Sequence, residues 1–424
     1  KKFIFSSKFN IDEIYLTTLI KFSHSKGKEK VEKKNIKNDS LKNLKEKTKN
    51  LFRPLFILYF VSLIGTTLVL STSEVKAFSG WDRGNSPSKM KLFTRNIFKL
   101  LPLKGFLKEQ PWSGDYWPTH KGGVSYRWAS PARTEKNKWM YKTPGKGVVP
   151  RNLSPIEKYD LYVGNKNFDL TNLERERTGI FTDRKIPEWE GLCHSWAPAT
   201  FLYENPQTIT VESPEGKEIT FYSSDMKALL TYHLHFNEAP KTKFLGSRCN
   251  LDFSELEKEY KKGLISREDL EAMMRMPECE DTNAGAFHVV LTNFVGRKNR
   301  SFIIDKTRDL EVWNQPVYGY ESKILEERKG ASKGAHPKTH KEITLETVVY
   351  YIAEVPQTFE LSLNQGSIEA ITFTYTLELD FFGRIIGGSW LSYERPDFIW
   401  TQNKPTFKGP FKELKGLYNL STSY

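Results

Sequence analysis

Cysteine is scarce in this chain: three cysteines occur in 424 residues, at positions 193, 249 and 279. Because three is an odd number, at least one thiol stays outside any disulfide within the chain. The sequence also lacks internal repeats and glycine-rich loops of the kind that cradle phosphate groups. These absences exclude a repeat architecture and give no support to nucleotide binding.

The excess of positive charge is concentrated at the beginning of the chain. Residues 1–77 hold 16 lysines and arginines against 7 acidic residues, and the remaining residues hold 48 against 44, which together make the 64 and 51 of the whole chain and its net charge of +13. The body of the chain has no concentrated basic stripe, which phosphate binding requires. We therefore predict no nucleic-acid partner.

An export signal is predicted inside residues 1–77. Residues 55–70 are mostly apolar, but this run is shorter than the ~20 residues of a membrane-spanning helix. Basic residues precede it, and Val75 and Ala77 supply small side chains where a signal peptidase cleaves. We expect a basic leader and signal sequence, and a protein that is secreted, periplasmic or on the cell surface. In the alternative, the leader is not cleaved and serves as a single-pass membrane anchor, through which alone the protein would contact the membrane.

Cys193 precedes a segment, residues 199–203, whose composition predicts a helix. Pro198 restricts where that helix begins, because proline is tolerated best in the first turn. The sequence therefore places Cys193 at or just before the helix N-terminus, where free N–H groups and the helix dipole favour a thiolate. The alternative is a small buried cysteine that packs under the helix.

A hairpin is predicted from two apolar, β-branched runs, residues 286–293 and 301–305, around a loop that contains Gly296. With the turn centred after Gly296, His288 and Asp305 would face each other with Cβ atoms about 5 Å apart. Asp305 would then orient the imidazole toward a cysteine nucleophile. A register slip of one residue would break this pairing.

The other histidines are weaker candidates. His194 points about 100° away from Cys193 if both are helical. His233 and His235 fall in a predicted helix, residues 224–235, where residues two apart do not face each other. Because no third ligand occurs at zinc-like spacing, no metal site is predicted.

The rest of the chain predicts an α+β fold. Cys249 and Cys279 bracket two short predicted helices within residues 252–276, and a disulfide between them would add about 3 kcal/mol and leave Cys193 free. In the alternative, Cys193 pairs with one of them and no enzyme results. Residues 78–150 are interpreted as an irregular segment, part of which is a candidate pro-segment, and residues 151–424 as the catalytic domain. Predicted strands follow the helices rather than alternating with them, at residues 343–355, 369–379 and 384–391.

Several blocks of this sequence together resemble the transglutaminase elicitor family of oomycetes, which also has bacterial members. The blocks are Gly191-Leu-Cys-His-Ser-Trp-Ala-Pro-Ala199, Phe287-His288, Asp305 and Val312-Trp-Asn-Gln-Pro-Val317, with flanking blocks at residues 111–118, 377–388 and 396–400. In plant-pathogen members the Trp-Asn-Gln-Pro block lies in a fragment that plants recognise. Tyr318 and Tyr320 stand here where the oomycete pattern has Arg and Phe, so plant recognition does not follow from the resemblance.

The resemblance implies a papain-like core, with the nucleophile-bearing helix packed on an antiparallel sheet. It implies a protein-glutamine γ-glutamyltransferase that joins a glutamine-donor protein to lysine or another primary amine, with Cys193, His288 and Asp305 as catalytic triad. Weaker candidates beside the triad are Trp196, Trp313, Asn314 and Gln315.

The sequence leaves open whether a cofactor is needed and which of several functions the protein has. Some transglutaminases depend on calcium, but the sequence has no EF-hand-type loop, and we assign no cofactor ligands. A papain-like cysteine peptidase and a glutamine deamidase use the same triad, and a non-enzymatic secreted surface-binding protein is a further alternative.

Overall fold

The structure is a computed structural model. It describes residues 79–91, 95–130, 143–237, 242–247, 254–266, 269–270, 281–306, 311–360, 367–392 and 394–423, which belong to one compact unit that begins at residue 76. The predicted leader lies outside the described residues. In the part that is described, no helix combines the length and the apolar character needed to cross a membrane.

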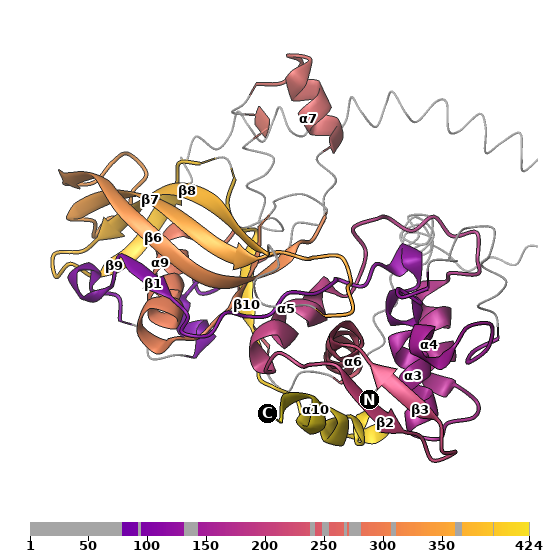
Figure 1. Ribbon diagram of the computed structural model, residues 1–424. Coiled ribbons are helices and arrows are strands. Elements are labelled where there is room, and N and C mark those ends of the chain that lie inside the picture. Colours follow the sequence, from indigo (N-terminus) through magenta and orange to yellow (C-terminus); the bar gives the residue numbers. More distant parts are fainter. Residues whose placement is uncertain are drawn as a thin grey trace, which may run out of the picture. The chain divides into compact units, whose positions relative to one another are not determined.

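Helices and antiparallel strands both contribute, which confirms the α+β prediction (Figure 1). The α-helices are α3 (Pro155–Tyr162), α4 (Asp169–Thr178), α5 (Cys193–Leu202), α6 (Ser223–Phe236), α7 (Ser254–Lys261), α9 (Ala284–Leu291) and α10 (Leu414–Thr422). The short 3-10 helices are η1 (Pro87–Met90), η2 (Phe98–Leu100), η3 (Thr119–Lys121), η4 (Gly123–Ser125), η6 (Pro150–Asn152) and η9 (Gly409–Phe411), and η8 (Thr292–Arg297) is a π-helical turn.

One eight-stranded sheet organises the molecule. Its order is β4-β10-β5-β6-β7-β8-β9, with β1 paired to β6, and the pairings between these strands are antiparallel. A separate hairpin consists of β2 (Ile209–Glu212) and β3 (Glu218–Phe221). The strands of the large sheet are β1 (Lys104–Phe106), β4 (Lys243–Gly246), β5 (Ile303–Asp305), β6 (Asn314–Lys329), β7 (Lys341–Ile352), β8 (Ile368–Leu379), β9 (Ile385–Trp390) and β10 (Phe398–Thr401).

The three predicted C-terminal strands are confirmed as β7, β8 and β9, with shifted ends. In β7 the side chains of Ile343, Leu345, Thr347 and Val349 are buried, and three of the residues between them are only half-buried. This period of two is the pattern that a strand with one face on the core produces. The helix predicted at residues 224–235 is also present, as α6.

The predicted hairpin at residues 286–305 is wrong in its first arm. Residues 284–291 form α9 instead, and the side chain of Asn283 caps it by accepting hydrogen bonds from the N–H groups of Gly285 (2.9 Å) and Ala286 (3.2 Å). All eight residues of α9 are buried. A helix that is buried all round has no polar face, so its apolar run cannot be told from a buried strand by periodicity.

Two hydrophobic cores lie on opposite faces of the short strand β5. The helical core includes Trp196 of α5 and Ile303, and the sheet core includes Phe287 of α9 and Ile304. Neighbouring residues of a strand point to opposite faces, so β5 is where the two cores meet. Figure 1 shows strands β6–β9 on one side and helices α3, α4 and α6 on the other, with α5 and β10 between them.

The N-terminal segment that was predicted to be irregular contributes to both cores. Its short strand β1 pairs with β6. Trp112 and Trp117 are buried in the helical core, whereas Met90 and Phe98 are buried in the sheet core. The boundary at residue 150 and the removal of a pro-segment stay predictions.

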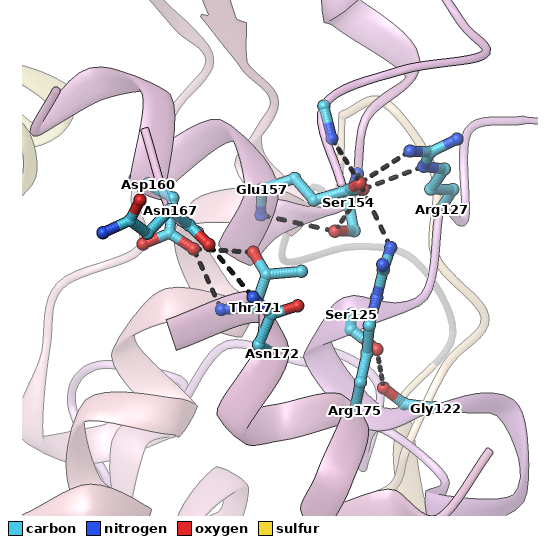
Figure 2. A network of polar contacts seen from close by, with 11 residues as sticks. Gly122, Ser125, Arg127, Ser154, Glu157, Asp160, Asn167, Thr171, Asn172 and Arg175 are labelled. Carbon is cyan, nitrogen blue, oxygen red and sulfur yellow. Dashed lines mark hydrogen bonds and ion pairs between the residues drawn. The ribbon is translucent and has the colours of Figure 1, made fainter. Parts of the chain in front are cut away.

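A buried ion-pair network anchors the same segment to the helices (Figure 2). The Arg127 guanidinium donates to both carboxylate oxygens of Glu157, at 2.8 and 2.6 Å, and Arg175 donates to Glu157 at 3.2 Å. Ser154 and Glu157 form a capping box at the start of α3. One carboxylate therefore joins α3, α4 and the segment before them.

The region predicted as two short helices is described in part. Helix α7 precedes Gly263, which has a positive φ of 71°, a conformation common just after a helix end. Ser266 and Asp269 form a capping pair, with Ser266 Oγ 2.7 Å from an Asp269 carboxylate oxygen. Cys249 and Cys279 lie outside the described residues, so their disulfide stays a prediction.

Candidate active site around Cys193

Cys193 is the first residue of α5, with Leu192 as the N-cap residue. The sequence placed it there correctly, although Pro198 lies further inside the helix than the first turn. The N–H of Leu192 donates to the carbonyl of Tyr116 at 2.6 Å, which ties the helix start to the N-terminal segment. Cys193 is a free thiol and only 6% exposed.

The sulfur lies against the start of β6. Cys193 Sγ is 3.4 Å from the carbonyl oxygen of Val312, to which the thiol donates, and Asn314 Nδ2 donates to Sγ at 3.5 Å. Trp400 Nε1 donates to Asn314 Oδ1 at 2.7 Å. Because the indole N–H is only a donor, it fixes which end of the Asn314 amide is oxygen. The Asn314 NH₂ group is thereby aimed at the sulfur.

Asp305 lies on the same side of the sheet as the sulfur. It is the Cα partner of Asn314 between β5 and β6, and directly opposed residues point to the same face. Ile303, two residues earlier in β5, points to the same face and belongs to the helical core. Asp305 is fully buried, and Oδ1 accepts the N–H of Trp313 at 3.0 Å.

The structure does not bring His288 to this group. His288 Nδ1 is 2.8 Å from the Tyr375 hydroxyl, its ring stacks on Phe98 with centroids 6.0 Å apart, and its Nε2 is buried without a hydrogen-bond partner. These neighbours belong to the sheet core, on the face of β5 opposite to Asp305. The predicted pairing of His288 with Asp305 is therefore wrong in this structure, because it required residue 288 to lie in a strand.

The electrostatic surroundings keep Cys193 protonated at neutral pH. Burial raises the pKa of the Cys193 thiol to about 11, against the hydrogen bonds from Asn314, which lower it. The negative charges of Glu354 and Asp305 raise it further. Loss of solvent therefore outweighs the stabilising effect of the helix N-terminus, and the thiol stays protonated in place of the expected thiolate. Burial likewise lowers the pKa of His288 to about 3, so its ring is neutral.

Tyr116 lies near the sulfur, since Cys193 is among the groups that act on it electrostatically. Its ring packs edge-on against Trp313 with centroids 5.7 Å apart, and its hydroxyl donates to the Glu188 carbonyl at 2.7 Å. Gly191 permits this packing, because a Cβ there would lie 2.5 Å from the Tyr116 ring. Both aromatic rings are half-buried, and Trp313 lies between Val312 and Asn314, the two residues that contact the sulfur.

The remaining weak candidates differ in place. Gln315 Nε2 lies 2.9 Å from both carboxylate oxygens of Glu354, and Glu354 acts on the thiol electrostatically. Trp196 is fully buried in the helical core, and its indole N–H has no hydrogen-bond partner. Gln315 thus positions a carboxylate near the sulfur, whereas Trp196 supports the helix from below.

Three groups near the sulfur were not singled out from the sequence: Tyr116, Glu354 and Trp400. Tyr116 and Trp400 fall in flanking blocks of the family resemblance, which pointed to these residues but assigned them no role at the site. Glu354 follows β7, and no local pattern distinguishes it from other strand-end acids. Asp115, next to Tyr116, is a half-buried carboxyl, and loss of solvent raises its pKa to about 6.

The other histidines form no metal site in the described part of the chain. His194 Nε2 and His235 Nδ1 are 2.9 Å apart. His233 instead contacts Asn237 at 2.8 Å and stacks on Phe407. No group of three or more His, Cys, Asp or Glu side chains suited to a metal is found among the residues described.

Comparisons with known proteins agree with this fold. No curated protein matches the chain. Among solved structures, the GP42 transglutaminase from Phytophthora sojae matches with a TM-score of 0.59 and 22% identity, over 81% of this chain and 98% of that chain. A family model described as transglutaminase elicitor matches residues 171–410. Because this match spans more than half of the sequence, the chain belongs to the transglutaminase elicitor family.

Proposed function

We propose that this protein is a protein-glutamine γ-glutamyltransferase that works through a thioester at Cys193. The observation that carries the proposal is the placement of a free thiol at the start of α5, with the Asn314 amide aimed at it. Sγ attacks the side-chain carboxamide of a protein glutamine, and ammonia leaves. A lysine amine then attacks the thioester, forms the isopeptide bond and releases the thiol.

Asn314 is the donor that we assign to the oxyanion. The carbonyl oxygen of a bound glutamine becomes negative when sulfur adds to its carbon, and a fixed N–H donor lowers the energy of that state. The Asn314 NH₂ group is held in place by Trp400. The backbone N–H of Cys193, at the helix start, is the second donor.

Proton transfer is assigned to Asp305 rather than to His288. Asp305 is opposite Asn314 in the sheet and acts on the thiol electrostatically, whereas His288 faces the sheet core. The thiol proton must reach a base before or during attack. In the resting arrangement it is shared with the carbonyl of Val312, so substrate binding has to displace it toward the carboxylate.

The surroundings of the sulfur favour an amine acceptor over water. Cys193 is 6% exposed beside the half-buried rings of Tyr116 and Trp313, and an acyl group there is shielded from hydrolysis. The carboxylate of Glu354 attracts the ammonium group of a lysine, which must lose a proton before its nitrogen attacks the thioester. We propose that the enzyme acts outside the cytoplasm, on protein substrates, as the predicted signal sequence requires.

The deciding experiment is incorporation of a fluorescent amine into casein. Wild type is compared with Cys193→Ala, Asp305→Asn and His288→Gln, each with and without a metal chelator. We expect no incorporation with Cys193→Ala, a large loss with Asp305→Asn, and retained incorporation with His288→Gln. A chelator effect would identify a metal requirement. Peptide-bond cleavage without incorporation would identify a peptidase, and ammonia release without incorporation a deamidase.

One observation favours a second candidate, a non-enzymatic binding protein. The pKa of Cys193 is raised to about 11, and His288, the predicted base, contacts Tyr375 in the sheet core instead of the sulfur. Intact mass after iodoacetamide treatment under non-reducing conditions separates the two. Rapid modification of Cys193 supports the enzyme, and complete protection of Cys193 together with inactivity on casein supports the binding protein.

A further inference from the structure

Two phenylalanines are exposed side by side at the turn that joins β8 to β9. Phe381 is 74% exposed and Phe382 70%, and their ring centroids are 5.6 Å apart. The turn is fixed by Asp380, whose Oδ1 accepts the N–H groups of Phe382 (3.0 Å) and Arg384 (2.9 Å). Gly383, with φ of 73°, adopts the left-handed conformation that closes it. The two rings are therefore presented on a rigid support.

Further apolar side chains adjoin this turn. The N–H of Phe98 donates to the carbonyl of Gly383 at 3.0 Å, and Ile97 forms a β-bridge with Arg384. Ile97 is 37% exposed and Leu100 50%. We define the phenylalanine patch as Ile97, Leu100, Phe381 and Phe382. Apolar side chains gathered in one exposed patch mark an interaction surface more often than scattered single ones.

Positive charge lies at the same end of the sheet. Residues 329–341, defined here as the lysine loop, join β6 to β7 and contain four lysines and no acidic residue. The ring of His340 in this loop is 5.3 Å from that of Phe381. Lys341 pairs with Glu327, while Lys329, Lys333 and Lys338 form no ion pair with a described residue. Arg95 and Lys99 flank the other half of the patch.

We propose that the phenylalanine patch and the lysine loop form one docking surface for an anionic lipid bilayer. Aromatic side chains on a rigid turn enter the headgroup boundary, and lysines around them meet lipid phosphates. A second copy of the chain fits this surface poorly, because two like-charged lysine loops would repel each other. The lysines therefore favour a negatively charged surface as the partner over a second copy of the chain.

The test is sedimentation of the full chain with vesicles of phosphatidylcholine alone or with added phosphatidylserine. We expect wild type to bind the phosphatidylserine vesicles more tightly. Phe381→Ser/Phe382→Ser should weaken binding to them by at least about tenfold. Lys333→Ala/Lys338→Ala should weaken it by about fivefold per lysine, and this effect should disappear at high salt.

Matched variants elsewhere separate the patch from the rest of the chain, including the apolar residues 55–70. Leu264→Ser removes an equally exposed apolar side chain, and Lys412→Ala/Lys415→Ala removes two exposed lysines; neither should change binding. Unchanged binding of the Phe381→Ser/Phe382→Ser variant, with an unchanged melting temperature, would overturn the proposal. So would loss of self-association in that variant without loss of vesicle binding, which would identify a contact between copies.

Discussion

The two cores of this protein are stabilised in different ways. The helical side contains buried charges: Glu157 is held between Arg127 and Arg175, and Lys158 donates to Asp225 at 2.5 Å. In the sheet core, the contact between α9 and the sheet is instead neutral, because the Tyr375 hydroxyl links His288 and Thr347, each at 2.8 Å. A buried charge fixes one arrangement, because the loss of its partner is costly, whereas neutral groups tolerate partial loss.

The largest expected effect on stability comes from breaking the helical network. Glu157→Gln leaves two guanidinium groups near a neutral amide, and we expect a loss of about 3–5 kcal/mol in the free energy of unfolding. Urea denaturation measures it. Lys104→Ala is the matched control, because it removes an ion pair with Glu321 that is exposed and therefore screened by solvent. Equal losses for the two variants would contradict the difference between buried and exposed pairs.

The same carboxylate makes the stability of the helical core depend on pH in the acid range. Burial alone would raise the pKa of Glu157, but the hydrogen bond and charges of Arg127 and Arg175 hold it below its usual value. Its contribution to stability is therefore present above the unfolded pKa near 4.5 and is lost as the pH falls through the lower folded value. Glu157→Gln should abolish that part of the acid dependence.

A second prediction concerns the boundary between the cores, where Asn314 faces Cys193. Asn314→Ala should reduce the rate of amine incorporation by about 10²–10³-fold, the usual cost of one oxyanion donor. Trp400→Phe is the control, since it breaks the same indole bond but keeps the Asn314 NH₂ group. It should lower the rate less, with a similar loss of stability. Equal rate losses would mean that Asn314 acts only through packing.

The sheet core should respond more weakly. Tyr375→Phe removes the hydroxyl that contacts His288 and Thr347, and we expect a loss of about 1–3 kcal/mol. His288→Gln tests the same core through pH. Burial holds the folded His288 pKa near 3, so the unfolded chain binds a proton first and stability falls as the pH drops below about 6.5. His288→Gln should remove part of that fall, which thermal unfolding at several pH values measures.

The sequence predicts these two regions unequally well. Strand β7 was predictable because its buried and half-buried side chains alternate, and the start of α5 was predictable from Pro198. Helix α9 was not, because every residue of it is buried and the pattern lacks a polar face. Because of this error, the prediction placed His288 on the same face of β5 as Asp305, whereas it lies on the opposite face. Asn314 was found only as a member of the Trp-Asn-Gln-Pro block, since its role depends on Trp400, which is far away in the sequence.

The smallest expected effect tests the charge at the site itself. Asp305 raises the pKa of the Cys193 thiol, although less than burial does. Asp305→Asn should therefore increase the rate of iodoacetamide labelling of Cys193 by a few-fold, about 1 kcal/mol or less in the free energy of ionisation. The same variant should lower amine incorporation, because it removes the proposed proton acceptor. A carboxylate that takes the thiol proton predicts these opposite changes at an unchanged melting temperature, whereas one that only supports the fold predicts a lowered melting temperature. Glu354→Gln serves as the comparison, since it removes another negative charge that acts on the sulfur while leaving Asp305 in place.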